Sequence, residues 1–382
     1  MFSFIRVFLL FFCGAAGYYY FFKSRESRKF EIPLELKIYF GFILITIVSI
    51  IYSIDARSSF IRSFSLIALL GNVLGLYAWL NYEKRQFSLI NILFYVVIFI
   101  FSINIIYGIV FHDRAWLTDI NMRFRGVFSH PNSFGSFCMV SYSVLFWKFL
   151  HSRYFLKIMI FITILAMILF HILSGSRSSF ISSIVICILW LVLRKKAKII
   201  TVALLLLFLF IIIFQIKTGS LNTFSRNVRS ENELTNLTGR EEIWTEAINL
   251  IVKRPFLGYG YEVSGKIFSS PLALYNIPNL EWLANSNESF HNGYITIALG
   301  LGFIGLFPWL FIIFSPGLRL IKKVNTEFIL VSLSIMFSCL ILNFAEYAIN
   351  PGASLSSIFF WVAWVLSLHI IQSFKISLGS CN

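Results

Sequence analysis

The chain has 382 residues, of which 58% are hydrophobic and only 13% are charged. A typical soluble domain has about a quarter of its residues charged, so this composition excludes an ordinary water-soluble protein. Several apolar blocks approach the length of about 20 residues that crosses the bilayer core as a helix. A transmembrane β-barrel would instead show alternating segments of about 10 residues. The sequence therefore predicts an all-α polytopic membrane protein.

The formal net charge is +15, which raises the question of a nucleic-acid partner. The basic residues, however, stand in short runs between apolar blocks, the positive-inside pattern of an integral membrane protein. We therefore expect membrane lipids, and no nucleic acid, as partners. The 5 cysteines form no CxxC pair, and none lies in the long polar segment. A disulfide framework and a zinc site are not expected.

The apolar blocks predict about 11 to 12 transmembrane helices. In chain order they cover residues 2–22, 34–54, 60–80, 88–111, 131–150, 155–173, 178–193, 199–216, 291–315, 327–344 and 353–374. The first block lacks a clear small-residue cleavage site, so we expect it to stay in the membrane rather than to be removed as a signal peptide. Three regions follow: about eight helices in 1–216, a polar loop with short helices in 217–290, and about three helices in 291–382.

The charges between the blocks predict the orientation. Every second connection is rich in lysine and arginine, and such connections lie in the cytoplasm. These basic connections lie near residues 23–29, 84–85, 148–157, 194–198 and 319–323. The long polar loop then faces outward and the C-terminus lies inside. An odd number of spans places the N-terminus outside, but a first block made of two short helices or a re-entrant hairpin would place it inside.

The short connections on the outward side carry arginine but no lysine. They contain Arg57, Arg62, Arg114, Arg123, Arg125 and Arg177. The guanidinium group binds phosphate through two parallel hydrogen bonds and stays charged. For any single residue, an exposed loop position explains the arginine equally well. As a group, outward arginines run against the topology bias and indicate an anionic ligand on the outer side.

The long polar segment contains one predicted helix. Thr238–Glu241 reads as a capping box before apolar residues at helical spacing, and Arg254-Pro255 predicts the end of the helix. A glycine-punctuated turn follows at Leu257–Tyr261, without a Walker or dinucleotide pattern. The segment ends in His291-Asn292 where the next apolar block begins. A histidine at the edge of a membrane helix is a plausible place for chemistry.

Several of these stretches together resemble one family. His291-Asn292 is followed by Gly302-Phe303-Ile304-Gly305, which is similar to the histidine–asparagine and paired-glycine signature of the O-antigen ligase and polymerase superfamily of bacterial envelope glycosyltransferases. The other matching stretches are Phe124–Asn132, Leu173–Ser178, Leu237–Trp244 and Arg254–Gly260. Each motif alone is weak, but their order and their common outward side make the resemblance specific.

The resemblance implies a helical, GT-C-like membrane fold with one large periplasmic loop, in the bacterial inner membrane. It implies transfer of a glycan from undecaprenyl diphosphate to an acceptor hydroxyl at the periplasmic face. A polymerase uses the next lipid-linked repeat unit as acceptor, and a ligase uses the lipid A core. The motif wording and compact length favour a polymerase of O-antigen or exopolysaccharide, with the ligase as the alternative. A chain-length regulator is a further partner that a processive polymerase would need.

His291 is the candidate catalytic residue. An imidazole titrates near neutral pH and suits a general base that takes the proton of an acceptor hydroxyl, in a direct displacement with inversion. Its structural alternative is an anchor for the following helix. Asn292 either orients this histidine or serves as a helix N-terminal residue. We expect no metal and no cofactor, because the sequence shows no Asp-x-Asp or carboxylate pair to hold an ion.

Arg177 and Arg240 are the candidates for binding the diphosphate, where fixed positive charge would stabilise the leaving group. Snorkelling of Arg177 and a solvated position for Arg240 are the structural alternatives. Arg125 is a weaker candidate for contact with phosphate or sugar. Glu346, a costly carboxylate near the outer end of its block, is expected to pair with an arginine or to assist the base. The remaining motif residues, His130, Gly302 and Gly305, are expected to be structural.

Two other classes of function compete with a glycosyltransferase. A transporter of lipid-linked sugars could use outward arginines, but it would more often show intramembrane charges and repeated broken helices. A structural membrane subunit would not explain a histidine and arginines on one side. The glycosyltransferase hypothesis requires Arg177, Arg240 and His291 to line one cavity.

Overall fold

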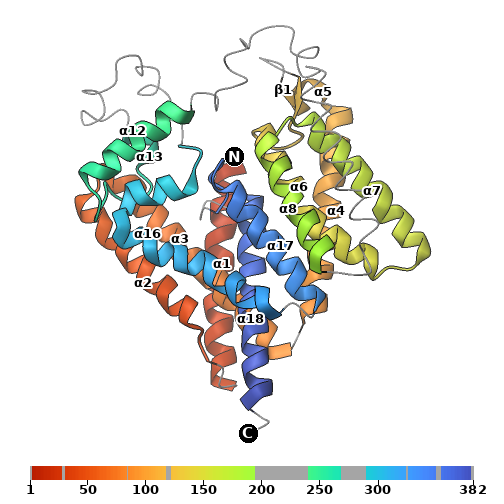
Figure 1. Cartoon of the computed structure of the whole chain (residues 1–382), viewed down its shortest axis with the longest axis horizontal. Helices are drawn as coiled ribbons and strands as arrows, with labels where there is room; N and C mark the ends of the chain where they lie inside the picture. The colour runs from red at the N-terminus through yellow and green to blue at the C-terminus, as the bar shows by residue number, and fades with distance from the viewer. Residues whose placement is uncertain are drawn as a thin grey trace.

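The computed structural model (Figure 1) describes residues 2–27, 31–83, 85–117, 122–193, 240–267, 290–323, 326–349 and 354–379. Its long helices are α1 (Phe2–Ser27), α2 (Leu34–Ser49), α3 (Ala56–Glu83), α4 (Gln86–Val110), α6 (Pro131–Leu150), α7 (Tyr154–Leu173), α8 (Arg177–Leu193), α12 (Arg240–Lys253), α16 (Gly293–Leu320), α17 (Glu327–Leu342) and α18 (Leu355–Gly379). The short elements are η1 (Ile50–Tyr52), α5 (His112–Ala115), β1 (Trp116–Leu117), β2 (Arg123–Phe124), α13 (Ser264–Ile267) and η3 (Ile321–Lys323).

The predicted all-α membrane architecture is confirmed. Within the described residues, 7 helices are long and apolar enough to cross a membrane, and the apolar helices α8 and α17 are shorter. Each predicted apolar block corresponds to a helix except the block at 199–216, which lies outside the described residues. The division at 216 and 290 stays a prediction for the same reason. The sequence does not predict the small antiparallel pair of β1 and β2, in which Trp116 lies opposite Phe124.

Helix α1 is one continuous helix of 26 residues, so the alternative of two short helices or a re-entrant hairpin is wrong. It packs against α3 through glycines that leave no room for side chains. A Cβ atom on Gly17 would lie 2.1 Å from the carbonyl oxygen of Gly71, and one on Gly75 would lie 2.6 Å from the Cα of Gly17. Such small residues let two membrane helices approach closely. The helix begins at the end of the bundle that carries α12, opposite the C-terminus (Figure 1).

Large aromatic side chains fill the space between α2, α16 and α18. Tyr39 of α2 stacks on Trp361 of α18, with ring centroids 5.2 Å apart. Trp364 of α18 donates its indole N–H to the carbonyl of Ile312 in α16 at 2.7 Å. A buried indole is stabilised when its N–H group has such a partner. These contacts fix the position of α16, which begins two residues after the candidate site residue His291.

Helix α12 lies where the sequence predicts the loop helix, and it ends at Lys253, just before Arg254-Pro255. Its apolar stripe of Ile243, Ala247 and Leu250 forms a separate small core with residues of the following turn, α13 and the start of α16. The stripe follows the spacing of an amphipathic helix. Helix α12 is therefore docked onto the end of the bundle and closes over the entrance to α16 (Figure 1).

Helix α16 is interrupted at Gly302, where φ is 59° and ψ is −161°. The turn after α12 satisfies the backbone groups that this break exposes. The N–H groups of Tyr259 and Gly260 donate to the carbonyls of Leu299 and Gly300, at 3.0 and 2.8 Å, and the Phe303 N–H donates to the carbonyl of Pro255 at 2.7 Å. A membrane helix tolerates a break when neighbouring groups replace the lost bonds. The sequence predicts a structural role for Gly302, and the structure places this glycine at a break in α16.

Candidate active site

The chain enters α16 through Phe290, His291 and Asn292. Phe290 is buried, and its carbonyl accepts the indole N–H of Trp244 in α12 at 2.8 Å. Asn292 is the N-cap of α16, since its Oδ1 accepts the N–H of Tyr294 at 3.0 Å. This is the ordinary N-cap role, which is the structural alternative for Asn292. The backbone on both sides of His291 is therefore anchored.

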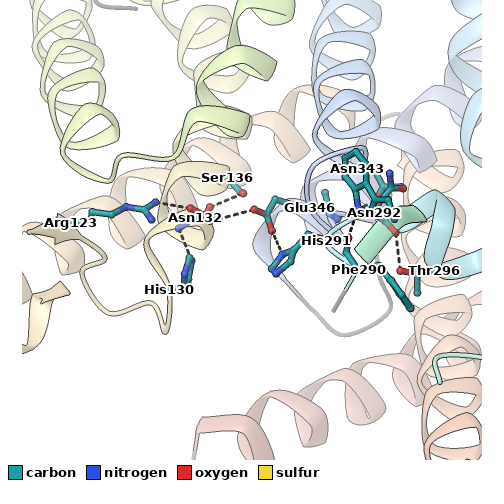
Figure 2. Close-up of polar contacts among 12 residues, drawn as sticks. Arg123, His130, Asn132, Ser136, Phe290, His291, Asn292, Thr296, Asn343 and Glu346 are labelled. Atoms are coloured by element: carbon teal, nitrogen blue, oxygen red, sulfur yellow. Dashed lines mark hydrogen bonds and ion pairs between the residues drawn. The ribbon is translucent and has the colours of Figure 1, made fainter. Parts of the chain in front are cut away.

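The segment after α17 folds against this entrance. The Gly293 N–H donates to the carbonyl of Asn343 at 2.8 Å. The side-chain oxygen of Asn343 accepts the N–H groups of Ala348 and Ile349, at 3.1 and 3.2 Å, which closes a turn over residues 343–349. Asparagine commonly organises turns in this way. The turn places Glu346 beside His291 (Figure 2).

His291 and Glu346 form the central pair of the site. The Nδ1 atom of His291 lies 3.3 Å from Oε2 of Glu346, and the two side chains are 30% and 17% exposed. A carboxylate accepts hydrogen bonds, so it favours the tautomer with the proton on Nδ1 and leaves Nε2 as the basic nitrogen. The pair is partly open to solvent, as a base that meets a substrate must be. A histidine oriented by a carboxylate is the arrangement that general-base chemistry uses on many folds.

A chain of hydrogen bonds continues from Glu346 to the other half of the bundle (Figure 2). The amide nitrogen of Asn132, at the start of α6, donates to Oε1 of Glu346 at 2.8 Å. The Asn132 oxygen accepts Nη2–H of Arg123 at 2.7 Å, and Arg123 Nε–H donates to the carbonyl of Ser174 at 2.8 Å. His130 is the N-cap of α6, and its Nδ1 accepts the Asn132 N–H at 3.1 Å. We call His291, Glu346, Asn132 and Arg123 the relay.

The predicted arginines occupy different positions around the relay. Arg177 is exposed at the start of α8, directly after the turn that Arg123 contacts. Arg125 donates to the carbonyl of Arg114 at 3.0 Å, so its described contacts brace the connection between α5 and α6. Arg240 begins α12, but its side chain lies outside the described residues. Convergence of Arg177, Arg240 and His291 on one cavity therefore stays a prediction.

A second carboxylate lies near the same turn. Glu262, which has φ of 60°, shares a hydrogen bond with Tyr347, the neighbour of Glu346. Burial raises the pKa of the Glu262 carboxyl, while Arg62 and the hydrogen bond with Tyr347 offset part of that increase. Burial also raises the pKa of Tyr347 well above its usual range, and the Glu262 charge adds to this effect. Two carboxylates with different environments therefore lie at the 343–349 turn. Glu346 belongs to the turn and contacts His291, and Glu262 contacts the next residue, Tyr347.

Sequence reasoning missed the roles of Arg123 and Asn132. Arg123 is one of the outward arginines, and Asn132 is part of a matching motif, but no spacing relates either residue to Glu346. The Asn132–Glu346 contact joins residues 214 positions apart. Within the described residues, no three His, Cys, Asp or Glu side chains gather where they could hold a metal ion.

Parts of this chain resemble known proteins. Residues 162–310 match the model of a family described as O-antigen ligase, and this region includes Arg177, Arg240 and His291. The chain is also similar to the ComP-specific O-oligosaccharyltransferase of Acinetobacter baylyi (strain ATCC 33305 / BD413 / ADP1), with 26% identity over 298 residues. That alignment covers 74% of this chain and 53% of the relative, so the chain spans about half the length of the curated relative it matches. The resemblance predicted from the motifs is confirmed.

Proposed function

Residues 162–310 match the O-antigen ligase family, and on that premise we propose that the chain is a membrane glycosyltransferase with His291 as its general base. The observation that supports this proposal most directly is the His291–Glu346 pair, with Nδ1 and Oε2 at 3.3 Å, in the matching motif at the entrance to α16. The donor is a glycan on undecaprenyl diphosphate, and the acceptor is a hydroxyl group. The enzyme acts in the bacterial inner membrane, with its site facing the periplasm.

The proposed reaction is a single displacement at the anomeric carbon. The acceptor oxygen forms the new glycosidic bond as the bond to the diphosphate oxygen breaks, and the configuration inverts. Nε2 of His291 takes the acceptor proton, and Glu346 stabilises the imidazolium that forms. General-base assistance of this kind contributes about 10² to 10⁴ in rate. Because the diphosphate is already a good leaving group, the reaction needs no covalent sugar intermediate.

Arg177 and Arg240 are the proposed ligands of the diphosphate. Arg177 is exposed at the N-terminus of α8, and Arg240 begins the helix that closes over the entrance to α16. Guanidinium groups bind phosphate oxygens in pairs and stabilise the charge that develops on the leaving group. Two such residues would supply this stabilisation without a metal ion. Arg125 contributes less, because it already donates to the Arg114 carbonyl.

The identity of the acceptor divides the proposal into two reactions. The residues of the matching motifs favour a polymerase that extends a lipid-linked repeat unit, with a chain-length regulator as a further partner. The matched family is described as O-antigen ligase, which favours the lipid A core as acceptor. The relative is named as an oligosaccharyltransferase specific for ComP. We keep the polymerase as the first candidate and the ligase as the second.

The experiment measures transfer by the purified protein in detergent with lipid-linked repeat units. We expect wild type to form longer lipid-linked chains from donor alone, with and without EDTA. His291→Ala should lose about 10² to 10⁴ in rate. His112→Ala is the matched control, because His112 is 62% exposed and pairs with Asp113 outside the site. That variant should keep wild-type activity.

The other outcomes decide between the alternatives. Product that appears only when lipid A core is supplied would assign the chain as a ligase. Loss of activity in EDTA would contradict the metal-independent mechanism. Equal product from wild type and His291→Ala would remove His291 from the mechanism and favour a transporter of lipid-linked sugars.

A further inference from the structure

We propose that Asn132 and Arg123 are positioning residues that hold the His291 side chain at a fixed position relative to the turn that leads to Arg177. The inference rests on the proposed function, because it assigns roles around the same base. Neither residue touches the reacting atoms. Both act through Glu346. Their contacts link residues 123–132 with Glu346 (Figure 2) and with the turn at Ser174.

The partners of Asn132 dictate the orientation of its amide. Arg123 has only donors, so the atom that faces it at 2.7 Å must be the amide oxygen. Glu346 in its ionised form has only acceptors, so the atom that faces it at 2.8 Å must be the amide nitrogen. The backbone N–H of Asn132 is also held, by Nδ1 of His130. Asn132 is therefore fixed at both its main chain and its side chain.

This arrangement restrains the carboxylate of Glu346. One oxygen, Oε1, is held by Asn132, and the other, Oε2, faces Nδ1 of His291 at 3.3 Å. A carboxylate held at one oxygen cannot rotate away from the imidazole without losing a charge-assisted hydrogen bond. The direction of Nε2 then follows from the position of the ring. Displacement of a reacting group by about 1 Å can cost about 10² in rate.

The other end of the relay reaches the turn before α8. Arg123 Nε–H donates to the carbonyl of Ser174 at 2.8 Å. Gly175, the next residue, has φ of 62°, and a Cβ atom there would lie 2.9 Å from Nε of Arg123. The turn thus leaves room for the guanidinium group and continues directly into Arg177 at the start of α8. The Arg123 side chain therefore connects the turn that precedes Arg177 with Asn132, which holds Glu346 beside His291.

The test follows the His291 imidazole by NMR in the full-length protein, with labelled histidine, in detergent. The His291 signal is the one lost in His291→Gln. We expect Glu346→Gln to move its titration midpoint to lower pH by about 1 unit, because an opposite charge is removed. Asn132→Leu should produce part of the same shift, because Glu346 is no longer held against the ring. Ser136→Ala is the matched control, since its hydroxyl lies one turn further along α6 and donates to the Asn132 carbonyl at 2.8 Å.

Transfer kinetics with lipid-linked repeat units supply the second readout. Asn132→Leu and Arg123→Gln should each lower kcat about tenfold with little change in KM, and the double variant should lose no more than either single variant. An unchanged His291 midpoint in Asn132→Leu, or additive losses in the double variant, would overturn the relay. A wild-type protein without transfer activity, but with the expected NMR shifts, would contradict the proposed function and leave the relay intact.

Discussion

His291 and Glu262 share an uncommon backbone conformation. Among the described residues they are the two non-glycine residues with positive φ, at 48° and 60°. Such a conformation costs about 1 to 3 kcal/mol and persists only where neighbours hold it. Trp244 and the Asn292 cap hold the chain around His291. Both strained residues present their side chains to the 343–349 turn, so the strain lies where the polar groups of the site meet.

The Glu262 carboxyl predicts a specific dependence of stability on pH. Burial raises its pKa from the ordinary value of 4.5, so the folded protein holds this proton to higher pH than the unfolded chain. The contribution to stability is therefore fully present below about pH 4.5 and is lost as the pH rises through the folded pKa. We expect Glu262→Gln to gain thermal stability over wild type at about pH 8 but not at about pH 4. Melting in detergent at both pH values measures this difference.

The control for this prediction is Asp113→Asn. The Asp113 side chain is fully exposed, with a relative exposure of 103%, so this change should leave the pH dependence of melting unaltered. A gain in Glu262→Gln that is equal at both pH values would show that the buried carboxyl does not ionise in this range.

At the scale of elements, α12 and the turn after it act as one unit with α16. The turn supplies N–H groups to Leu299 and Gly300 and carbonyls to the residues after Gly302. Helix α12 adds the Trp244 bond to the residue before His291. The broken helix and the loop helix therefore stabilise each other. The family motif around Gly258 and Gly302 is explained by this backbone-to-backbone contact.

We predict that Gly302→Ala strongly destabilises this unit. At φ of 59° a Cβ atom would lie 2.3 Å from the carbonyl carbon and oxygen of Phe256, which are backbone atoms and cannot swing aside. The φ of 59° and ψ of −161° lie in a backbone region that is essentially confined to glycine, which costs alanine about 1 to 3 kcal/mol, and the clash adds to this loss. Thermal unfolding in detergent should show a lower melting temperature.

Gly41→Ala in α2 is the matched control. A Cβ atom at Gly41 would have no neighbour within 4 Å, so alanine should be neutral or stabilising by about 0.5 to 1 kcal/mol through helix propensity. Equal melting temperatures for the two variants would contradict the role assigned to the break at Gly302.

At the scale of the whole molecule, contacts between early and late helices hold the bundle together. Glu35 of α2 is fully buried, and its Oε1 lies 3.1 Å from Nη1 of Arg319 near the end of α16. Ser315 donates to the same oxygen at 2.8 Å. A buried charge is stable only when it is paired and hydrogen-bonded. This contact lies at the end of α16 opposite to His291, so it anchors the helix that begins directly after the site.

We expect Arg319→Gln to destabilise the fold by about 1 to 3 kcal/mol, because it removes the charge partner of a buried carboxylate. This loss is smaller than the loss of about 3 to 5 kcal/mol that is expected when a fully buried ion pair is broken. The reason is that the Arg319 side chain is 41% exposed, so water partly screens its charge. Lys322→Gln, at an exposed residue in the same connection, is the control. Thermal unfolding in detergent compares the two, and equal losses would show that general surface charge, rather than this pair, matters.

Sequence alone determined the helical membrane architecture and the family. Apolar blocks of helical length can satisfy their backbone groups in lipid only by forming helices, so composition and spacing were sufficient for the spans. The loop helix was predicted with its end at Arg254-Pro255, because caps and prolines are local signals. The sequence indicates both His291 and Glu346, the first through its motif and the second as a costly carboxylate near a membrane edge.

Only the tertiary structure decided which of these side chains meet. Glu346 contacts His291 and Asn132, which lie 55 and 214 positions away in the chain, and no local pattern encodes such pairs. The sequence does not distinguish Arg123 from the other outward arginines. Only the fold brings the turn before α8 and the start of α6 into contact with its side chain. These long-range contacts depend on how the helices pack. The sequence pattern specifies which face of each helix is apolar, but it does not specify which loops meet at the helix ends.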